Sequence, residues 1–191
     1  MAAQIPTRPD FKAIESAAIE TADHRTKILA LIGNLVFSWS NNESMFIYVL
    51  MILLDTDEVS AAIVFATLNT TRARIELVQR LAKAKIKDRE TAKVLERLID
   101  RFNDCTRVRN EFNHCMYTLS DRGEITHTHA MRIRENKGRL TLGEVRAMDE
   151  ARLNEMVKTI NNLKTLNREL WDFLPRLQES VATPPPSQPT R

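Results

Sequence analysis

The stretch LERLIDRFNDCTRVRNEFNHCM, Leu95–Met116, carries the most regular helical pattern of the chain. Its apolar stripe recurs at alternating steps of three and four residues, the spacing of one face of a packed helix. The stripe consists of Leu95, Leu98, Phe102, Cys105, Phe112 and Met116. Arg109 occupies the remaining position of this stripe. Because an isolated charge among apolar side chains is costly, we expect a carboxylate, a bound anion or a water-filled cleft beside Arg109.

Helical spacing also dominates the rest of the 191-residue chain, which contains only 4 glycines. We predict helices over residues 11–54, with a break near Ala22, and over 59–84, 88–116 and 142–174. Turn signals at Asp121–Gly123 and Asn136–Gly138 predict a β-hairpin insertion over about 117–140. The sequence therefore predicts an all-α fold, a four-helix up-down bundle with a small β-hairpin insertion before the last helix.

The chain length suits one domain of roughly 150 residues with tails at both ends. We expect a flexible N-terminus over residues 1–9 and a helical domain over 10–175, with Asp10 as the first helix cap. Pro175 is predicted to mark the end of the last helix. Residues 176–191, which are rich in proline, are predicted to be a disordered tail.

The cysteines and the apolar segments favour a cytoplasmic protein. Cys105 and Cys115 are predicted to lie about 15 Å apart along one helix, too far for a disulfide, and unpaired thiols fit a reducing compartment. The N-terminus shows no secretory signal. The segment 28–54 is long and apolar, but Asn41, Asn42 and Glu43 interrupt it at a depth that is costly in lipid. We therefore predict a buried core helix there and no membrane span.

The strongest functional pattern follows Arg109. Asn110 and His114 are four residues apart, so they share one face of a helix, whereas Arg109 and His114 are separated by about 140° around it. Histidine suits proton transfer, and arginine offers a permanently charged fork of donors for a phosphate. Asparagine can orient either group. Such residues can flank a groove in which charge develops away from water, and Glu43 is a possible supporting residue.

An arginine and asparagine followed by three residues and a histidine, near the end of the third of four helices, resemble the Rx4–6H motif of HEPN domains. The resemblance implies a metal-independent endoribonuclease with Arg109, Asn110 and His114 as catalytic residues and no cofactor. Histidine would act as acid or base, arginine would bind the scissile phosphate, and the product would carry a 2′,3′-cyclic phosphate. The resemblance also implies a homodimer, an RNA substrate, and a protein antitoxin or regulator as a possible partner.

Other interpretations of the same residues stay open. One is a non-catalytic HEPN-like bundle that binds a nucleotide, RNA or a protein partner. Another is a structural dimerisation module in which a carboxylate, such as that of Glu43 or Asp104, neutralises Arg109. His127 and His129 alternate on one face of a predicted strand, but no third zinc ligand stands at a matching spacing. An exposed strand face is therefore the simpler interpretation, and we predict no metal site. The net charge of +3 permits an anionic partner without requiring one.

Overall fold

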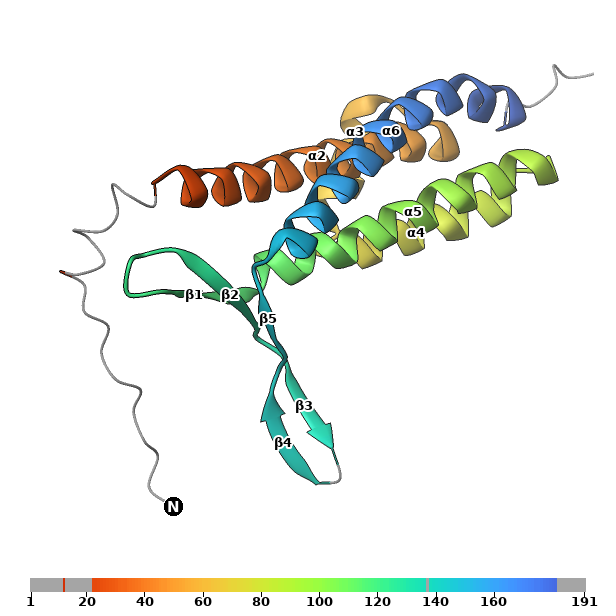
Figure 1. The fold of residues 1–191 in the computed structure, drawn as a ribbon. Coiled ribbons are helices and arrows are strands. Elements are labelled where there is room, and N and C mark those ends of the chain that lie inside the picture. Colours follow the sequence, from red (N-terminus) through yellow and green to blue (C-terminus); the bar gives the residue numbers. More distant parts are fainter. Residues whose placement is uncertain (1–11, 13–21, 137, 182–191) are drawn as a thin grey trace, which may run out of the picture. The chain divides into compact units, whose positions relative to one another are not determined.

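A computed structural model of the protein describes residues 12, 22–136 and 138–181. It is mostly helical, with a β-region between the last two helices (Figure 1). The helices of the described part are α2 (Ala22–Leu54), α3 (Glu58–Thr67), α4 (Thr71–Lys85), α5 (Arg89–Asn113) and α6 (Glu150–Val181). The predicted helical fold with a small β insertion before the last helix is confirmed, whereas the finer up-down bundle remains a prediction. The flexible N-terminus predicted over 1–9 lies outside the described residues, as does most of the predicted tail.

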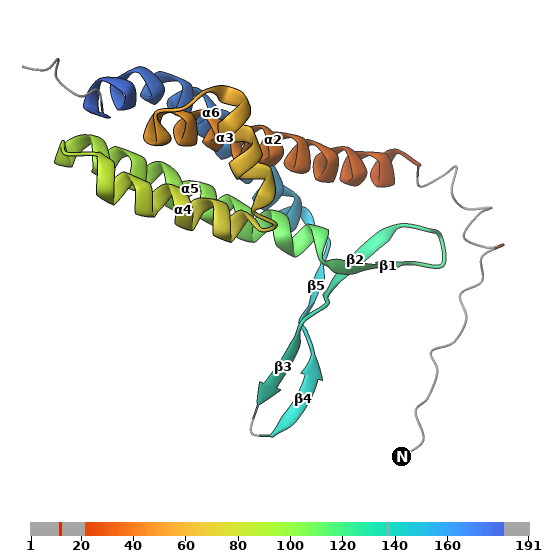
Figure 2. The same ribbon diagram turned by 180° about the vertical axis from the view of Figure 1, so that it is seen from behind.

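The β-region is larger than the predicted hairpin. Its strands are β1 (Cys115–Leu119), β2 (Ile125–Ala130), β3 (Ile133–Asn136), β4 (Arg139–Leu142) and β5 (Val145–Ala147). They form a three-stranded antiparallel sheet in the order β1-β2-β5 and a separate two-stranded hairpin, β3-β4. Figure 2 shows the hairpin extending beyond the sheet. The turn predicted at Asp121–Gly123 does join β1 to β2, and Gly123 has a φ of 79°, a conformation that favours glycine.

The predicted start of the last helix is wrong. Leu142 ends β4, and Val145, which lies within the predicted helix, begins β5 and is 56% exposed. The helix begins instead after Asp149, whose Oδ1 accepts a hydrogen bond of 2.9 Å from the backbone N–H of Arg152. A helical spacing of a few apolar residues is too short a signal to place the start of a helix, and the cap at Asp149 decides it.

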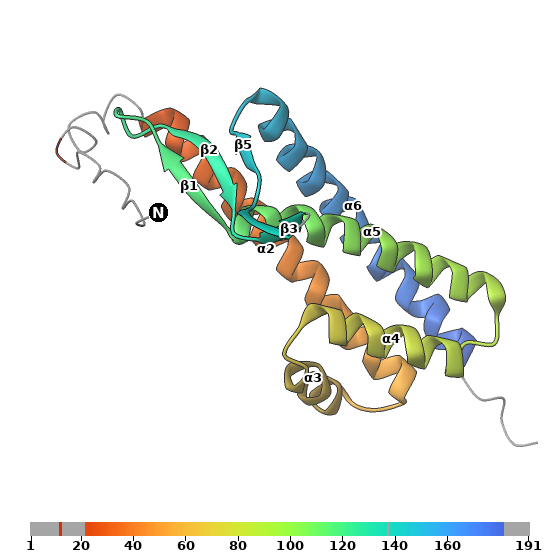
Figure 3. The same ribbon diagram turned by 90° about the horizontal axis from the view of Figure 1, so that it is seen from below.

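The helix predicted over 59–84 is in fact two helices (Figure 3). Asp57 caps α3 by accepting from the N–H of Ser60 at 2.9 Å. Leu68 is extended, and Thr70 begins a new helix because its hydroxyl accepts from the N–H of Ala73 at 3.1 Å. The apolar periodicity continues across this break, so periodicity alone could not reveal it.

The predicted end of the last helix is also wrong, because α6 continues through Pro175 to Val181. Proline removes one backbone donor, but side chains beyond it hold the final turns in place. Leu177 is fully buried, and Arg176 Nε donates to Thr91 Oγ1 at 2.9 Å. Packing of this last segment outweighs the missing backbone hydrogen bond.

The chain divides into two compact units. The first comprises the chain up to Val36 and Arg107–Ile160, and the second comprises Phe37–Thr106 and the chain from Asn161 onward. The buried apolar residues of the first unit are Ile28, Leu35, Val108, Phe112, Ile125, Met148, Leu153, Met156 and Ile160. The second unit has the larger apolar core, which includes Phe46, Phe102, Leu163, Leu166 and Leu170. The polar interruption in α2 belongs to this second unit.

Asn42 explains part of that interruption. It is 1% exposed and its Nδ2 donates to the backbone oxygens of Ser38, at 2.8 Å, and Leu163, at 2.9 Å. The amide thus joins α2 to α6 in the second unit, while Asn41 is exposed.

Among the described helices, none combines the length and the apolar run that a membrane crossing requires, which agrees with the prediction for residues 28–54.

Candidate functional site at the end of α5

The three residues of the Arg-Asn-His motif lie at the C-terminal end of α5 in the first unit. Arg109 is half-buried, and its Nη1 donates to Oδ1 of Asn110 at 2.8 Å. The helix ends at Asn113, and the backbone N–H of His114 still donates to the carbonyl of Asn110 at 3.0 Å. The His114 side chain is exposed. The arginine and asparagine therefore interact directly, and the histidine stands one turn further on, accessible to a ligand.

A hollow of about 80 Å³ lies beside this helix end. Its lining residues are Asn110, Glu111, His114, Cys115, Thr128, Ala130, Arg132, Glu144, Arg146 and Arg152. Asn110 and His114 thus share one hollow, as the predicted site requires. Arg109 is not among the lining residues and reaches the hollow through its hydrogen bond to Asn110.

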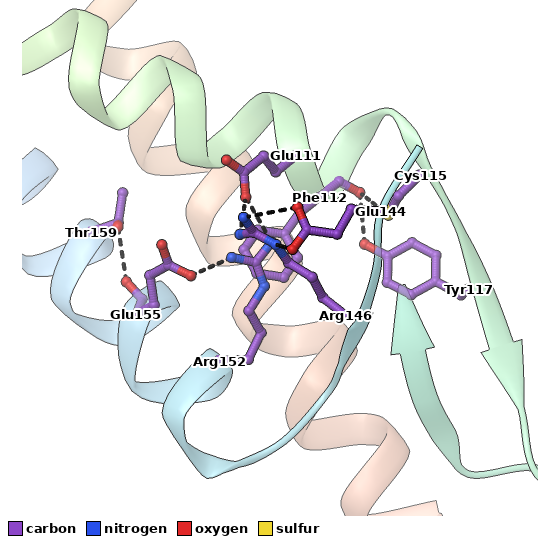
Figure 4. A network of polar contacts seen from close by, with 9 residues as sticks. All are labelled: Glu111, Phe112, Cys115, Tyr117, Glu144, Arg146, Arg152, Glu155 and Thr159. Carbon is purple, nitrogen blue, oxygen red and sulfur yellow. Dashed lines mark hydrogen bonds and ion pairs between the residues drawn. The ribbon is translucent and has the colours of Figure 1, made fainter. Parts of the chain in front are cut away.

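Two arginines that the sequence did not single out, Arg146 and Arg152, also line the hollow. Figure 4 shows their side chains close to each other and to Glu111. Glu111 Oε2 accepts from both, at 3.0 Å from Arg146 Nη1 and 2.9 Å from Arg152 Nη2. Arg146 also pairs with Glu144 at 3.4 Å, and this hydrogen bond raises the pKa of Arg146. Glu111 is therefore the bridge that holds the two guanidinium groups beside each other.

Arg152 is the buried member of this network. Its side chain is 7% exposed, and its guanidinium carbon lies 4.3 Å from the centre of the Phe112 ring, a cation–π contact. It also forms an ion pair with Glu155. Within the part of the chain that the structure describes, Nε of Arg152 is buried and has no hydrogen-bond partner. The glutamates neutralise much of the positive charge on this wall.

Tyr117 and Cys115 connect β1 to the end of α5. The Tyr117 hydroxyl donates to the backbone oxygen of Phe112 at 2.7 Å, and Cys115 Sγ lies 3.4 Å from the same oxygen. Burial raises the pKa of both the Tyr117 hydroxyl and the Cys115 thiol. Because only the thiolate is a good nucleophile, Cys115 is suited to a structural role. Both cysteines have free thiols, as the sequence predicted.

Glu43, the possible supporting residue, is placed elsewhere. It belongs to the second unit, where its carboxylate accepts from Thr71 Oγ1 at 2.5 Å and pairs with Arg74 at 3.1 Å. It is not among the residues that line the hollow. Its carboxylate is thus satisfied by neighbours within its own unit, and the supporting role of Glu43 stays a prediction.

The histidines of β2 differ from each other. His127 is exposed, whereas Nε2 of His129 donates to the backbone oxygen of Gly143 at 3.1 Å. A Cβ atom at Gly143 would lie 2.7 Å from the oxygen of Ala130, so this close approach requires glycine. Over the described ranges, no group of three or more His, Cys, Asp and Glu side chains is arranged to hold a metal ion.

Little in the local sequence indicated that Arg146 and Arg152 belong to the candidate site. Arg146 stood in a region assigned to a helix, and the structure places it in β5. The spacing of Arg152 and Glu155, three residues apart on α6, was the one visible sign of an ion pair.

Comparisons of the chain with protein families, with curated proteins and with solved structures find no match.

Proposed function

We propose that the hollow at the end of α5 is a metal-independent endoribonuclease site of the HEPN type. His114 would transfer protons, and Arg109 with Asn110 would bind the scissile phosphate. The observation that carries this proposal is the pairing of an accessible histidine with an arginine-bound asparagine on one small hollow. A volume of about 80 Å³ suits a single phosphate group better than a whole nucleotide.

The proposed reaction is a transesterification within the RNA backbone. The 2′-hydroxyl of RNA attacks the neighbouring phosphorus, a new P–O bond forms, and the bond to the 5′ oxygen breaks. His114 removes the proton from the attacking hydroxyl or supplies the proton to the departing oxygen. The Arg109 guanidinium would steady the charge that develops on the phosphate oxygens. The products are a 2′,3′-cyclic phosphate and a free 5′-hydroxyl.

A single His114 provides only one of the two proton-transfer groups at a time. A homodimer that brings a second copy of the motif to the same RNA would supply the other histidine, together with a second arginine. This arrangement is part of the proposal.

A non-catalytic role in binding RNA, a nucleotide or a protein partner is the second candidate. It is favoured by one specific observation: Arg109 does not line the hollow, and its guanidinium already interacts with Asn110. In that case Asn110 and the arginine would position a bound phosphate, and His114 would have no chemical role. Replacement of the histidine therefore separates the two functions.

The direct test is RNA cleavage in the presence of a chelator, with mixed RNA as substrate and the ends of the products identified. We expect cyclic phosphate and 5′-hydroxyl ends, with cleavage by His114→Ala reduced by roughly 100-fold or more. Arg109→Ala should lose a comparable part of the activity. Matched controls are His127→Ala and Arg107→Ala, since both side chains are exposed and neither lines the hollow.

Two results would decide against catalysis at this site. If His114→Ala cleaves RNA as fast as the unaltered protein, the histidine has no role in proton transfer. If the protein binds RNA without cleaving it, and Arg109→Ala alone weakens binding, the non-catalytic function is the correct one.

A further inference from the structure

The hairpin β3-β4 starts at the wall of the hollow. The backbone N–H of Met131 donates to the oxygen of His114 at 3.3 Å, and that of Ala130 donates to the oxygen of Glu144 at 3.0 Å. Arg132, the residue before β3, lines the hollow. Four strand residues beyond this root extend about 13 Å. A chain-like ligand that enters the hollow could therefore continue along the hairpin.

The hairpin has two chemically different faces. Residues paired across antiparallel strands share a face, and the register pairs Ile133 with Leu142 and Glu135 with Leu140. The remaining register pairs are Arg134 with Thr141 and Asn136 with Arg139, so Arg139 and Thr141 lie on the other face. Ile133 and Leu140 are 72% and 67% exposed. Neither face of this two-stranded element is covered by the three-stranded sheet (Figure 1).

Two exposed arginines at the hairpin, Arg132 and Arg139, are available to a ligand, in contrast to Arg146 and Arg152. Residues 131–142 contain four basic residues and one acidic residue. Arg132 and Arg139 are exposed, and among the described residues neither has an acidic partner. Arg146 and Arg152, on the wall of the hollow, are instead paired with glutamates. An anionic polymer would therefore find its free counter-charges on the hairpin.

We propose that the β3-β4 hairpin is an arm that binds the phosphate backbone of RNA next to the hollow, with Arg132 and Arg139 as phosphate contacts. The choice of RNA rests on the proposed function of the hollow. The arm gives the substrate its position: a phosphate in the hollow would be followed by further phosphates along the arginine-bearing face. Such contacts add affinity and register without reading the base sequence.

The test is equilibrium binding of the full chain to a fluorescent 2′-O-methyl oligouridine, measured at several salt concentrations. This probe has no free 2′-hydroxyl, so it cannot be cleaved by the proposed reaction, and binding is read separately from catalysis. We expect the double variant R132Q/R139Q to bind roughly tenfold more weakly. The slope of log affinity against log salt should fall by about 1.4, or about 0.7 for each lost phosphate contact.

Two further variants make the result specific. R80Q/K83Q removes the same charge from exposed positions on α4, and it should leave both affinity and salt slope unchanged. I133S/L140S alters the apolar face and should also leave the slope unchanged. Circular dichroism of each variant shows whether it has kept its fold.

Several outcomes would contradict the proposal that the hairpin binds RNA. The unaltered protein could fail to bind the probe, or R132Q/R139Q could bind no more weakly than R80Q/K83Q. A loss of binding confined to I133S/L140S would identify the hairpin as an apolar docking face for a protein instead. If R132Q/R139Q weakens binding but His114→Ala cleaves RNA at the full rate, the hairpin binds RNA and the catalytic proposal is wrong. The two proposals can therefore fail separately.

Discussion

Two arginines, one in each unit, lie over phenylalanine rings in nearly the same way. The guanidinium carbon of Arg74 is 4.2 Å from the Phe65 ring centre, and that of Arg152 is 4.3 Å from the Phe112 ring centre. Their hydrogen-bond partners differ. Arg74 Nε donates to the backbone oxygens of Phe65 and Leu68, which terminate α3, and its side chain also pairs with Glu43. Within the part of the chain that the structure describes, the Arg152 guanidinium pairs with side chains alone, those of Glu111 and Glu155.

This difference indicates different roles for similar packing. Arg74 satisfies carbonyl groups left open at a helix end, a requirement of the backbone itself. Arg152 satisfies no backbone oxygen in the described contacts, and it lines a hollow through a glutamate that it shares with Arg146. Ion pairs of a buried side chain such as Arg152 are weak evidence for stability alone. We infer that Arg74 stabilises its unit and that Arg152 shapes the candidate site.

The largest loss of stability is expected from removing the phenylalanine ring beneath each arginine. Phe112 is 1% exposed and Phe65 is 8% exposed, so replacement of either by alanine should lower the free energy of unfolding by about 3–5 kcal/mol. Urea unfolding measures this loss. At a temperature where both variants are folded, only Phe112→Ala should also reduce RNA cleavage. Equal activity of the two variants would contradict the distinction between the two arginines.

Replacing Arg152 itself should have the next largest effect. Arg152→Ala leaves Glu111 and Glu155 without their buried partner, and we expect a loss of about 2–3 kcal/mol. This is below the roughly 3–5 kcal/mol of fully buried pairs because both glutamates are partly exposed to solvent. Arg152→Met keeps the contact with Phe112 and should recover part of this loss in urea unfolding.

The matching change in the second unit is Arg74→Met. It keeps the ring contact but abandons two backbone oxygens, so little stability should be recovered relative to Arg74→Ala. If methionine restores stability equally well at both positions, the two arginines do not differ in the way we infer.

A smaller effect tests how β1 is joined to the candidate site. Tyr117→Phe removes the hydrogen bond to the oxygen of Phe112 and should cost about 1 kcal/mol. Tyr48→Phe is the matched control in the second unit, where the Tyr48 ring contacts Trp171 at 5.5 Å between centroids. In thermal unfolding, Tyr117→Phe should have a lower Tm than the unaltered protein, whereas the Tm of Tyr48→Phe should hardly change.

The smallest effect on stability is expected at an exposed ion pair, in which Arg176 Nη2 lies 3.5 Å from Asp88 Oδ2. Hydrogen bonds from the side chain and backbone of Thr91 lower the pKa of Asp88 to about 2. Because this pKa lies below its usual value, the stabilisation is present above about pH 4 and is lost as the pH falls towards 2. Asp88→Asn should therefore lower Tm modestly near neutral pH.

The pH dependence supplies its own control. The Tm difference between the unaltered protein and Asp88→Asn should shrink between about pH 4 and pH 2 and then disappear. A difference that stays constant over this range would show that the carboxylate charge does not contribute to the cap of α5.

The sequence by itself determined the helical face of α5 and the caps that precede two helices. Leu95, Leu98, Phe102, Cys105 and Phe112 are all buried, as their spacing predicted, and Asp57 and Asp88 hold the helix starts where their side chains reach the backbone. These features depend on residues within one or two turns of each other. The pairing of Asn110 and His114 on one hollow follows from the same local geometry.

Only the tertiary structure decided the rest. Met116, the last position of the predicted stripe, is 47% exposed in β1, because α5 ends at Asn113 and the chain turns into the sheet. The end of α6 beyond Pro175 depends on Thr91, a residue 85 positions away in sequence. Glu111, Arg146 and Arg152 meet only because a strand and two helices converge. Contacts between distant residues leave no periodic trace in the sequence, so neither the wall of the hollow nor the placement of Glu43 could be derived from it.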